Sequence, residues 1–320
     1  MYMFKYIMKR LGLLVMTFLI IIIICFVLIK SLPIVIDVQI GKDRAILEAA
    51  LKARGYFDPI PVQFFSYIKR IFLYGDFGIC INLPEYRNRD VLDVFREKLP
   101  PTILINVYST LVAVPIGIAL GIFAALKKNK WQDQVISTTV MLFISVPSFI
   151  YAFLVQYLFC FVLGWFPLIM NAGFNYLDPD MFRSMLPAVI ALSFGSIAGY
   201  ARSTRAELTE VLTSDFMLLA RTKGLTKAQA TTRHALRNAM VPIFPSIVGE
   251  FVSVLSGSLI IEKIFSVPGV GGLYLASINT QDYDAFMFLS GFYILIGLLA
   301  SIVIDLSYGV IDPRIRMGAK

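Results

Sequence analysis

Residues 202–237 read RSTRAELTEVLTSDFMLLARTKGLTKAQATTRHALR and form the longest polar interval in the second half of a very hydrophobic chain. The apolar residues in the first part of this stretch recur every three or four positions, which predicts a helix with one apolar stripe. The predicted stripe consists of Leu208, Val211, Leu212, Phe216 and Leu219. We therefore expect a helix, a tight turn and a second helix within this interval.

The turn is predicted at Gly224, which can adopt the left-handed conformation that ends a helix. Two basic residues precede it, where the helix dipole favours cations. Thr226 and Gln229 then have the spacing of a capping box, in which each side chain bonds the backbone N–H of the other residue. A second short helix is therefore expected over 227–238. By itself this pattern fits an ordinary helical loop as well as a docking surface.

The composition identifies a membrane protein. Of the 320 residues 58% are hydrophobic, and the mean hydropathy is +0.77, whereas soluble domains are roughly 45–50% apolar. Cys25, Cys80 and Cys160 are too scattered to predict a disulfide framework. The net charge of +8 does not imply nucleic acid as a partner, because an excess of Lys and Arg in a membrane protein usually marks cytoplasmic loops.

Apolar runs predict six transmembrane helices, so the expected fold class is an all-α integral membrane protein in a lipid bilayer. The first run follows a basic N-terminus but is longer than a usual signal-peptide core, and we expect it to remain uncleaved. Pro147 lies inside the third run and permits a kink. The predicted spans are 11–29, 102–126, 134–164, 186–201, 238–261 and 286–308.

These spans divide the chain into four parts. They are an N-terminal transmembrane helix (1–31), a large extracytoplasmic segment (32–99), a five-helix domain (100–308) that contains residues 202–237, and a tail (309–320). The outer segment contains helix-like stretches at 45–53, 62–74 and 90–99.

Charge predicts the orientation. The proposed inner segments carry 16 Lys and Arg residues, whereas the two short outer loops, 165–185 and 262–285, carry only Arg183 and Lys263. The proposed inner segments are 1–10, 127–133, 202–237 and 309–320. Both termini and the polar interval are therefore expected in the cytoplasm.

The sequence offers no evident catalytic chemistry. His234 is the single histidine, which excludes a multi-histidine metal site, and it has no evident nucleophile or carboxylate partner. No P-loop motif is present, and the glycines at 269–272 lack the spacing of a dinucleotide fingerprint. We therefore expect no catalytic residues, no metal ligands and no cofactor bound by this chain, which is not predicted to be an enzyme.

Two acidic residues lie within predicted spans, where charge is costly and often functional. Asp305 is near the inner end of the sixth span, and we expect it to pair locally or to face water. Glu250 is near the middle of the fifth span, where a proton- or ion-coupled site and a locally satisfied carboxylate are both open.

Three separated motifs carry a resemblance to a known family. The segments ARTKGL (220–225) and RHALRNA (233–239) resemble the cytoplasmic loop of binding-protein-dependent ATP-binding cassette (ABC) importer permeases, specifically the oligopeptide/dipeptide (and nickel) family. DPRI at 312–315 and GWFP at 164–167 fit the same family. The family pattern E-x-x-F-x-x-P-G-x-G is matched by Glu262, Phe265, Pro268, Gly269 and Gly271.

Some residues depart from the family pattern. Leu218, Leu219 and Ala220 stand where the wider superfamily has E-A-A. Phe216 replaces the usual tyrosine, and Thr222 replaces alanine. These departures concern individual polar contacts and leave the docking role of the loop in place.

The resemblance implies the ABC importer type I transmembrane fold over 100–308 and a multi-pass protein of the bacterial plasma (inner) membrane. The chain would pair with a paralogous permease subunit to form the pathway for peptides, and its long segment 32–99 resembles that of the first permease subunit. An extracytoplasmic solute-binding protein would deliver the substrate. Two cytoplasmic ATPase subunits would bind ATP and Mg and would dock on the coupling loop, 202–237.

The resemblance also implies which residues contact the ATPase. The coupling helix would be 218–227, and Gly224 would allow close backbone approach. The expected contacts are Leu218, Leu219, Ala220, Arg221, Lys223, Gly224, Leu225 and His234. Two alternatives stay open on the residues alone, which are an ion-coupled secondary transporter and a membrane scaffold that transports nothing.

Overall fold

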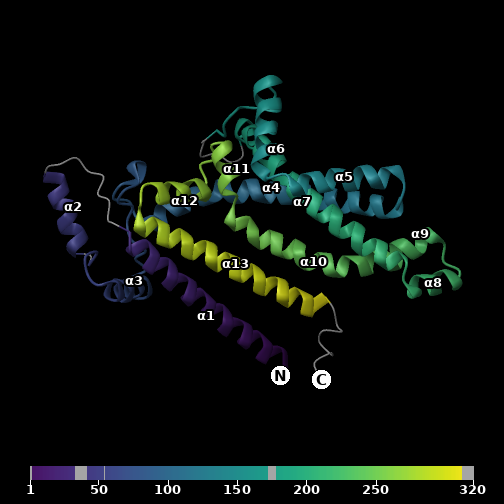
Figure 1. The fold of residues 1–320 in the computed structure, drawn as a ribbon, viewed down its shortest axis with the longest axis horizontal. Helices are drawn as coiled ribbons and strands as arrows, with labels where there is room; N and C mark the ends of the chain where they lie inside the picture. Colours follow the sequence, from purple (N-terminus) through teal and green to yellow (C-terminus); the bar gives the residue numbers. More distant parts are fainter. Residues whose placement is uncertain (1, 33–41, 54, 172–177, 312–320) are drawn as a thin grey trace.

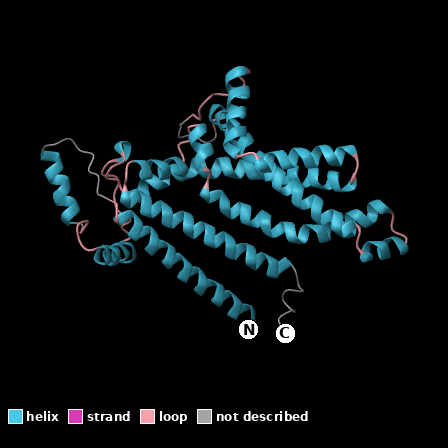
Figure 2. Cartoon of the chain, viewed as in Figure 1, coloured by secondary structure: helices cyan, strands magenta, loops and turns pink. Residues whose placement is uncertain are grey.

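The computed structural model describes residues 2–32, 42–53, 55–171 and 178–311. Within these ranges the regular elements are helices, and an isolated bridge pairs Ile79 with Asp90. Figure 2 shows this helical architecture along the described chain. The predicted all-α fold class is therefore confirmed.

Five continuous helical runs are long and apolar enough to cross a membrane, and a bent pair of helices makes a sixth span if it is counted as one. Only 11% of the most apolar window of the first helix is buried inside the chain, as expected for a surface that faces lipid. The five runs are α1 (Tyr2–Lys30), α4 (Val91–Leu126), α7 (Pro179–Leu212), α9 (Lys227–Ala230) leading into α10 (Leu236–Ser253), and α13 (Tyr283–Ile311).

The third predicted span is a broken helix. α5 (Trp131–Ser145) and α6 (Ser148–Val155), which continues as π-helical turns over Gln156–Val162, are bent by 104° relative to each other. Pro147 explains the break, because proline disfavours a helical conformation at the preceding residue and Val146 is extended. The kink permitted at Pro147 is confirmed, and the bent pair makes the predicted third span when its two helices are counted as one.

The second span begins earlier than the sequence predicts. α4 starts at Val91 and passes through Pro100 and Pro101, so the proposed junction between the outer segment and the five-helix domain falls inside a helix. Proline lacks a donor but holds φ near the helical value, which lets two consecutive prolines remain within a helix that is supported by its neighbours. The helix predicted over 90–99 is the first part of α4.

Two further boundaries differ from the prediction. α7 has 34 residues and extends beyond the predicted fourth span at both ends. The fifth span ends earlier, because α10 and the 3-10 turn after it end at Ser256. Gly257 then adopts a φ of 63° and separates this span from the short helix α11 (Leu259–Ile264).

The outer segment is attached to the start of α13. The Asp282 carboxylate accepts hydrogen bonds from the backbone N–H groups of Ile81 and Asn82, at 2.6 and 2.8 Å. This contact joins residues about 200 positions apart in sequence. The helix-like stretches predicted at 45–53 and 62–74 are α2 (Lys42–Ala53) and α3 (Ile60–Tyr74), and both lie at the same end of the molecule (Figure 1).

The spans α4 and α7 pack closely along a seam that requires glycine. A side chain at Gly117 would reach the Ile197 carbonyl oxygen at 2.8 Å, and one at Gly121 would reach the Ala201 carbonyl oxygen at 2.7 Å. Glycine therefore lets the two backbones approach each other. α1 lies beside α13 on the other side of the molecule, as Figure 1 shows.

Candidate functional site

The polar interval 202–237 is a helix–break–helix–turn–helix and not two helices. α7 ends at Leu212, and α8 (Asp215–Thr222) begins after a break at Thr213 and Ser214. Both hydroxyls bond carbonyl oxygens of the last turn of α7, at 2.9 Å to Glu210 and 2.6 Å to Val211. Such side-chain bonds compete with a continuing helix. The predicted single stripe is therefore wrong: its first three residues lie on α7 and its last two on α8.

The inner face of α8 is buried against the chain itself. Met217 and Ala220 pack in a cluster with Leu208 of α7 and with alanines of α4, α9 and α10. Ala220 is 9% exposed, so its side chain points into this cluster. Leu225 lies partly buried at the edge of the same cluster. The structure thus places two of the eight predicted ATPase-contact residues toward the interior.

The outer face of α8 carries apolar side chains that the described chain leaves uncovered. Phe216, Leu218 and Leu219 are 42%, 63% and 55% exposed. Arg221, Lys223 and His234 are also exposed. Figure 1 places α8 and α9 at the end of the molecule opposite α2 and α3. The other six predicted contact residues are therefore exposed and combine apolar groups with cations.

The turn after α8 has the predicted construction. Gly224 has a φ of 91°, and a side chain built on it would meet nothing within 4 Å. The capping box is present, because the Thr226 N–H donates to Gln229 Oε1 at 3.0 Å and the Gln229 N–H donates to Thr226 Oγ1 at 3.3 Å. The second helix does not stop near residue 238 but passes through a π-helical turn, Thr231–Ala235, into α10. α8 is therefore held between two transmembrane helices.

A basic groove lies beside α8. It has a volume of about 550 Å³ and is bounded by the end of α4, the α4–α5 loop, and helices α8 and α9. The acidic residue on its wall is Asp215. Its basic lining residues are Lys128, Lys130, Arg221 and Lys227. This charge favours an acidic partner surface.

One partly buried ion pair near this groove was not anticipated from the sequence. Arg205 Nη2 of α7 donates to Asp133 Oδ2 at 2.8 Å, and the Asp133 carboxylate also accepts the Asn129 N–H at 2.9 Å. The Asp133 side chain is only 3% exposed. The pair fixes the α4–α5 loop to α7. A sequence signal was present, since an aspartate follows a run of lysines and an arginine lies one turn inside the polar interval.

The family motif after the fifth span is an internal clamp. Glu262 is 1% exposed, and its carboxylate accepts the Gly271 N–H at 2.8 Å and the Thr102 hydroxyl at 3.0 Å. Thr102 in turn accepts the Val270 N–H at 2.9 Å. Burial raises the pKa of the Glu262 carboxyl, while these hydrogen bonds oppose the rise. Glu262 therefore joins α11, the start of α12 (Val270–Asn279) and α4.

The other residues of this motif serve the same clamp. A side chain at Gly269 would collide with the Glu262 carboxylate and with the Thr102 hydroxyl, and one at Gly271 would lie 2.8 Å from Glu262 Oε2. Phe265 is buried in the largest apolar cluster, and its carbonyl accepts the Met170 N–H at 2.9 Å. Pro268 precedes the glycine loop. The motif DPRI at 312–315 lies outside the described residues.

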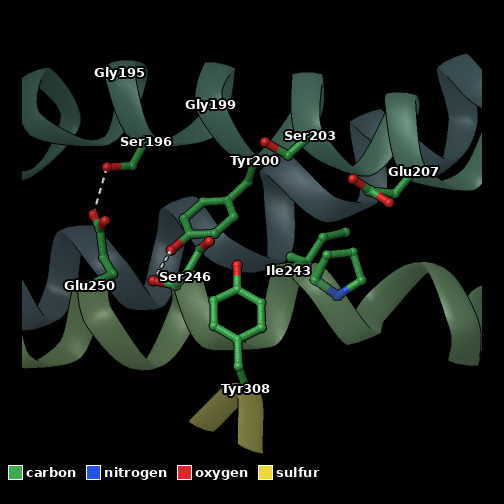
Figure 3. A pocket seen from close by; sticks show the side chains of 11 residues that line it. Gly195, Ser196, Gly199, Tyr200, Ser203, Glu207, Ile243, Ser246, Glu250 and Tyr308 are labelled. Carbon is green, nitrogen blue, oxygen red and sulfur yellow. Dashed lines mark hydrogen bonds between the residues drawn. The ribbon is translucent and has the colours of Figure 1, made fainter. Parts of the chain in front are cut away.

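A polar pocket separates α7 from α10 (Figure 3). Its volume is about 510 Å³, and α13 contributes Tyr308 to its wall. Ser196 of α7 donates to Glu250 Oε1 of α10 at 2.7 Å, and the Tyr200 hydroxyl donates to the Ser246 carbonyl at 3.3 Å. These two bonds are the dashed lines in Figure 3.

The pocket lining is rich in hydroxyl groups and carboxylates and includes no Lys or Arg. Its polar lining residues are Ser196, Tyr200, Ser203, Glu207, Ser246, Glu250 and Tyr308. Of these, only Glu250 was a candidate from the sequence. The serines at 196 and 203 lie seven residues apart, which places them on one face of α7, and this spacing was the available signal.

The two membrane acids have different surroundings. Asp305 Oδ2 lies 2.9 Å from Arg10 Nη1, so the expected local pairing of Asp305 is confirmed. Glu250 bonds Ser196 and also faces the pocket, which agrees with either of the two interpretations left open. No group of three or more His, Cys, Asp or Glu residues that could hold a metal occurs in the searched part of the chain, 2–311 without its three gaps.

Comparison with known proteins decides the family. Residues 117–317 match the model of the binding-protein-dependent transport system inner membrane component, and residues 3–106 match the model of the N-terminal part of the membrane component of such systems. The chain belongs to this family of ABC importer permeases. The permease is 35% identical to the dipeptide transport system permease protein DppB of Bacillus subtilis (strain 168), with 99% of each chain covered.

Other relatives and solved structures agree. The permease is 34% identical to the oligopeptide transport system permease protein OppB of Escherichia coli (strain K12), with 81% of each chain covered. It aligns with a chain of an amino acid ABC transporter crystallised with histidines, at 22% identity and a TM-score of 0.50, over 68% of the permease and 94% of that chain. It also aligns with the MetNI methionine ABC transporter, at 15% identity and a TM-score of 0.51, over 68% of the permease and 97% of that chain. These two likenesses show the fold of an ABC importer transmembrane domain.

Proposed function

We propose that this permease is one membrane subunit of an ATP-driven importer that moves peptides delivered by an extracytoplasmic binding protein. The relatives named for dipeptide and oligopeptide transport support this substrate class. A paralogous permease would supply the other half of the pathway. ATP and Mg would bind to two ATPase subunits, and this chain would perform no catalysis itself.

The observation that carries the proposal is the exposed apolar face of α8. Phe216, Leu218 and Leu219 would be costly to leave in water, at roughly 25 cal/mol per Å² of apolar surface. Exposed apolar patches next to cations are typical of protein interaction sites. We assign this face, with Arg221, Lys223 and the open backbone at Gly224, to the ATPase contact.

The connections of α8 provide the coupling. The break at Thr213 and Ser214 joins α8 to α7, and the capped turn joins it through α9 to α10. The two spans that α8 connects are also the two that bound the polar pocket. A displacement of α8 by ATPase closure would therefore change the spacing of α7 and α10 directly.

We assign the polar pocket to the wall of the translocation pathway. Polar and charged groups at membrane depth usually face a bundle interior or a water-filled cavity. Seven polar side chains around about 510 Å³ meet this description. The distribution of basic residues supports placing α8, and with it both termini, in the cytoplasm.

The test is ATP-dependent uptake of a labelled dipeptide into proteoliposomes that contain the complete complex. We compare the wild type with Gly224→Asp and with Ala228→Asp. Position 228 is exposed in the first turn of α9, where the helix dipole tolerates an acid. We expect Gly224→Asp to lose ATPase binding and uptake, and Ala228→Asp to retain most of both.

Other outcomes would point elsewhere. Uptake that follows an ion gradient without ATP would replace the proposal with a secondary transporter. Normal coupling in Gly224→Asp would reduce Gly224 to a helix end. Equal losses in both variants would show that the charge of the whole segment matters, and not the face of α8.

A further inference from the structure

The outer helix α3 has two unlike faces. Its inner face packs against α1 and α13: the ring centroids of Phe64 and Tyr67 lie 5.3 and 5.6 Å from that of Phe26. Ile68 and Ile71 pack in the same cluster. These four residues of α3 have the spacing of one helix face, so the orientation of α3 about its own axis is fixed by packing.

The opposite face of α3 is apolar and exposed. Phe65 is 72% exposed and Phe72 is 81% exposed. Val62 and Leu73 lie on the same side and are also exposed. At 100° per residue these four positions fall within about one third of the helix circumference, together with Ser66 and Lys69. A large aromatic surface is thus left uncovered by the described part of the chain.

The position of α3 continues a surface that faces lipid. α3 contacts α1 near the outer end of α1, whose side chains in this region, including Ile23, Val27 and Leu28, are exposed and apolar. In Figure 1 α1 extends across the view whereas α3 is seen nearly end-on, so the two helices cross. A helix that crosses a transmembrane helix at its end lies along the membrane surface.

The charge of α3 also suits a membrane surface. Residues 60–74 include Lys69 and Arg70 and no acidic residue. Lys69 lies in the middle of the exposed apolar face, and a lysine there can place its stem along lipid while its ammonium group reaches a phosphate. Aromatic residues are enriched at this depth of the bilayer.

We propose that α3 is an interfacial helix, whose exposed face inserts among the phospholipids of the outer leaflet and holds the outer segment against the membrane. Helices of this kind bury their apolar face roughly 5–10 Å below the headgroups. The occupant is lipid and not a protein, because the apolar face is continuous with the lipid-facing side of α1.

Tryptophan fluorescence in brominated lipid tests this proposal. In the complete complex Trp131 and Trp165 of this chain are changed to Phe, and Phe72→Trp is introduced. The emission of the complex whose permease lacks tryptophan is subtracted, so that the difference reports position 72. Glu85→Trp in the same background is the matched control, because Glu85 is exposed in the outer segment but lies on another element. The vesicles contain phosphatidylcholine brominated at acyl carbons 6 and 7, or at carbons 11 and 12.

We expect the Phe72→Trp signal to be quenched at least about twofold more than that of Glu85→Trp, and more strongly by the shallow bromines than by the deep ones. Iodide in the external buffer should show the reverse order between the two variants. Quenching of Phe72→Trp no greater than the control would overturn the proposal. So would a signal that lipid leaves unchanged and that the binding protein or the paralogous permease shields from iodide.

Discussion

Two of the family motifs of this permease face in opposite directions. The loop after the fifth span turns its glutamate inward, where Glu262 is 1% exposed and bonds three elements together. The coupling loop turns Leu218 and Leu219 outward, and both side chains are more than half exposed. A sequence motif can therefore consist of residues that stabilise the fold from within or of residues that contact another protein. Only the direction of the side chains separates these two cases.

The largest effect is expected at the inward motif. Glu262→Ala would leave the buried Gly271 N–H unpaired and would open a cavity, so we expect a loss of about 2–4 kcal/mol in stability. Glu262→Gln keeps one acceptor and should lose clearly less. Thermal unfolding of the purified permease in nanodiscs measures both. Unchanged melting with lost stimulation by the extracytoplasmic binding protein would show that this motif contacts a partner.

The second prediction uses two neighbouring residues of α8. Leu219→Asp should weaken ATPase binding at least tenfold, about 1.4 kcal/mol, while its unfolding temperature stays close to that of the wild type. Ala220→Asp should instead lower the unfolding temperature of the permease, because it buries a charge in the cluster around Leu208. Binding measured by surface plasmon resonance, beside melting curves, separates the two. If both variants lose binding and both melt normally, Ala220 belongs to the contact surface after all.

A smaller effect is expected in the pocket. Glu250→Gln removes a carboxylate that bonds Ser196 in a polar wall, and we expect peptide uptake to fall about threefold, which corresponds to ~0.7 kcal/mol. The dependence of uptake on pH should remain that of the wild type. A changed pH profile in this variant would revive proton coupling at Glu250. Ser196→Ala is the matched control for loss of the hydrogen bond alone.

The smallest effect is expected between α1 and α13. Arg10 and Asp305 form a pair at 2.9 Å, but their side chains are 42% and 27% exposed. Such pairs typically contribute less than about 1 kcal/mol. Arg10→Gln should therefore leave the unfolding temperature within a degree or two. A large fall in the unfolding temperature would show that the membrane shields this pair from water more than the exposure of its side chains indicates.

The sequence predicted those features that depend on neighbouring residues. The capping box at Thr226 and Gln229, the left-handed Gly224 and the kink permitted at Pro147 depend on a few adjacent positions, and all three are present. The hydrophobic runs also located the spans, because bilayer thickness fixes their minimum length.

The features that the sequence missed depend on tertiary packing. Local spacing could not reveal that Ala220 is buried, because the alanines that cover it come from three other helices. Nor could it show that the first part of α4 continues through Pro100 and Pro101, since a helix held by its neighbours tolerates residues that a free helix does not. The role of Glu262 depends on Thr102, 160 positions away.

The glycine seam between α4 and α7 has a mechanical consequence. Carbonyl oxygens of α7 lie against Gly117 and Gly121, so that not even a methyl group fits between the two helices. This close packing makes the seam stiff. The opposite side of α7 borders about 510 Å³ of open space and is compliant. A force that arrives through α8 would therefore move α4 and α7 as one strut. Almost all of the relative motion would then be concentrated between this strut and α10.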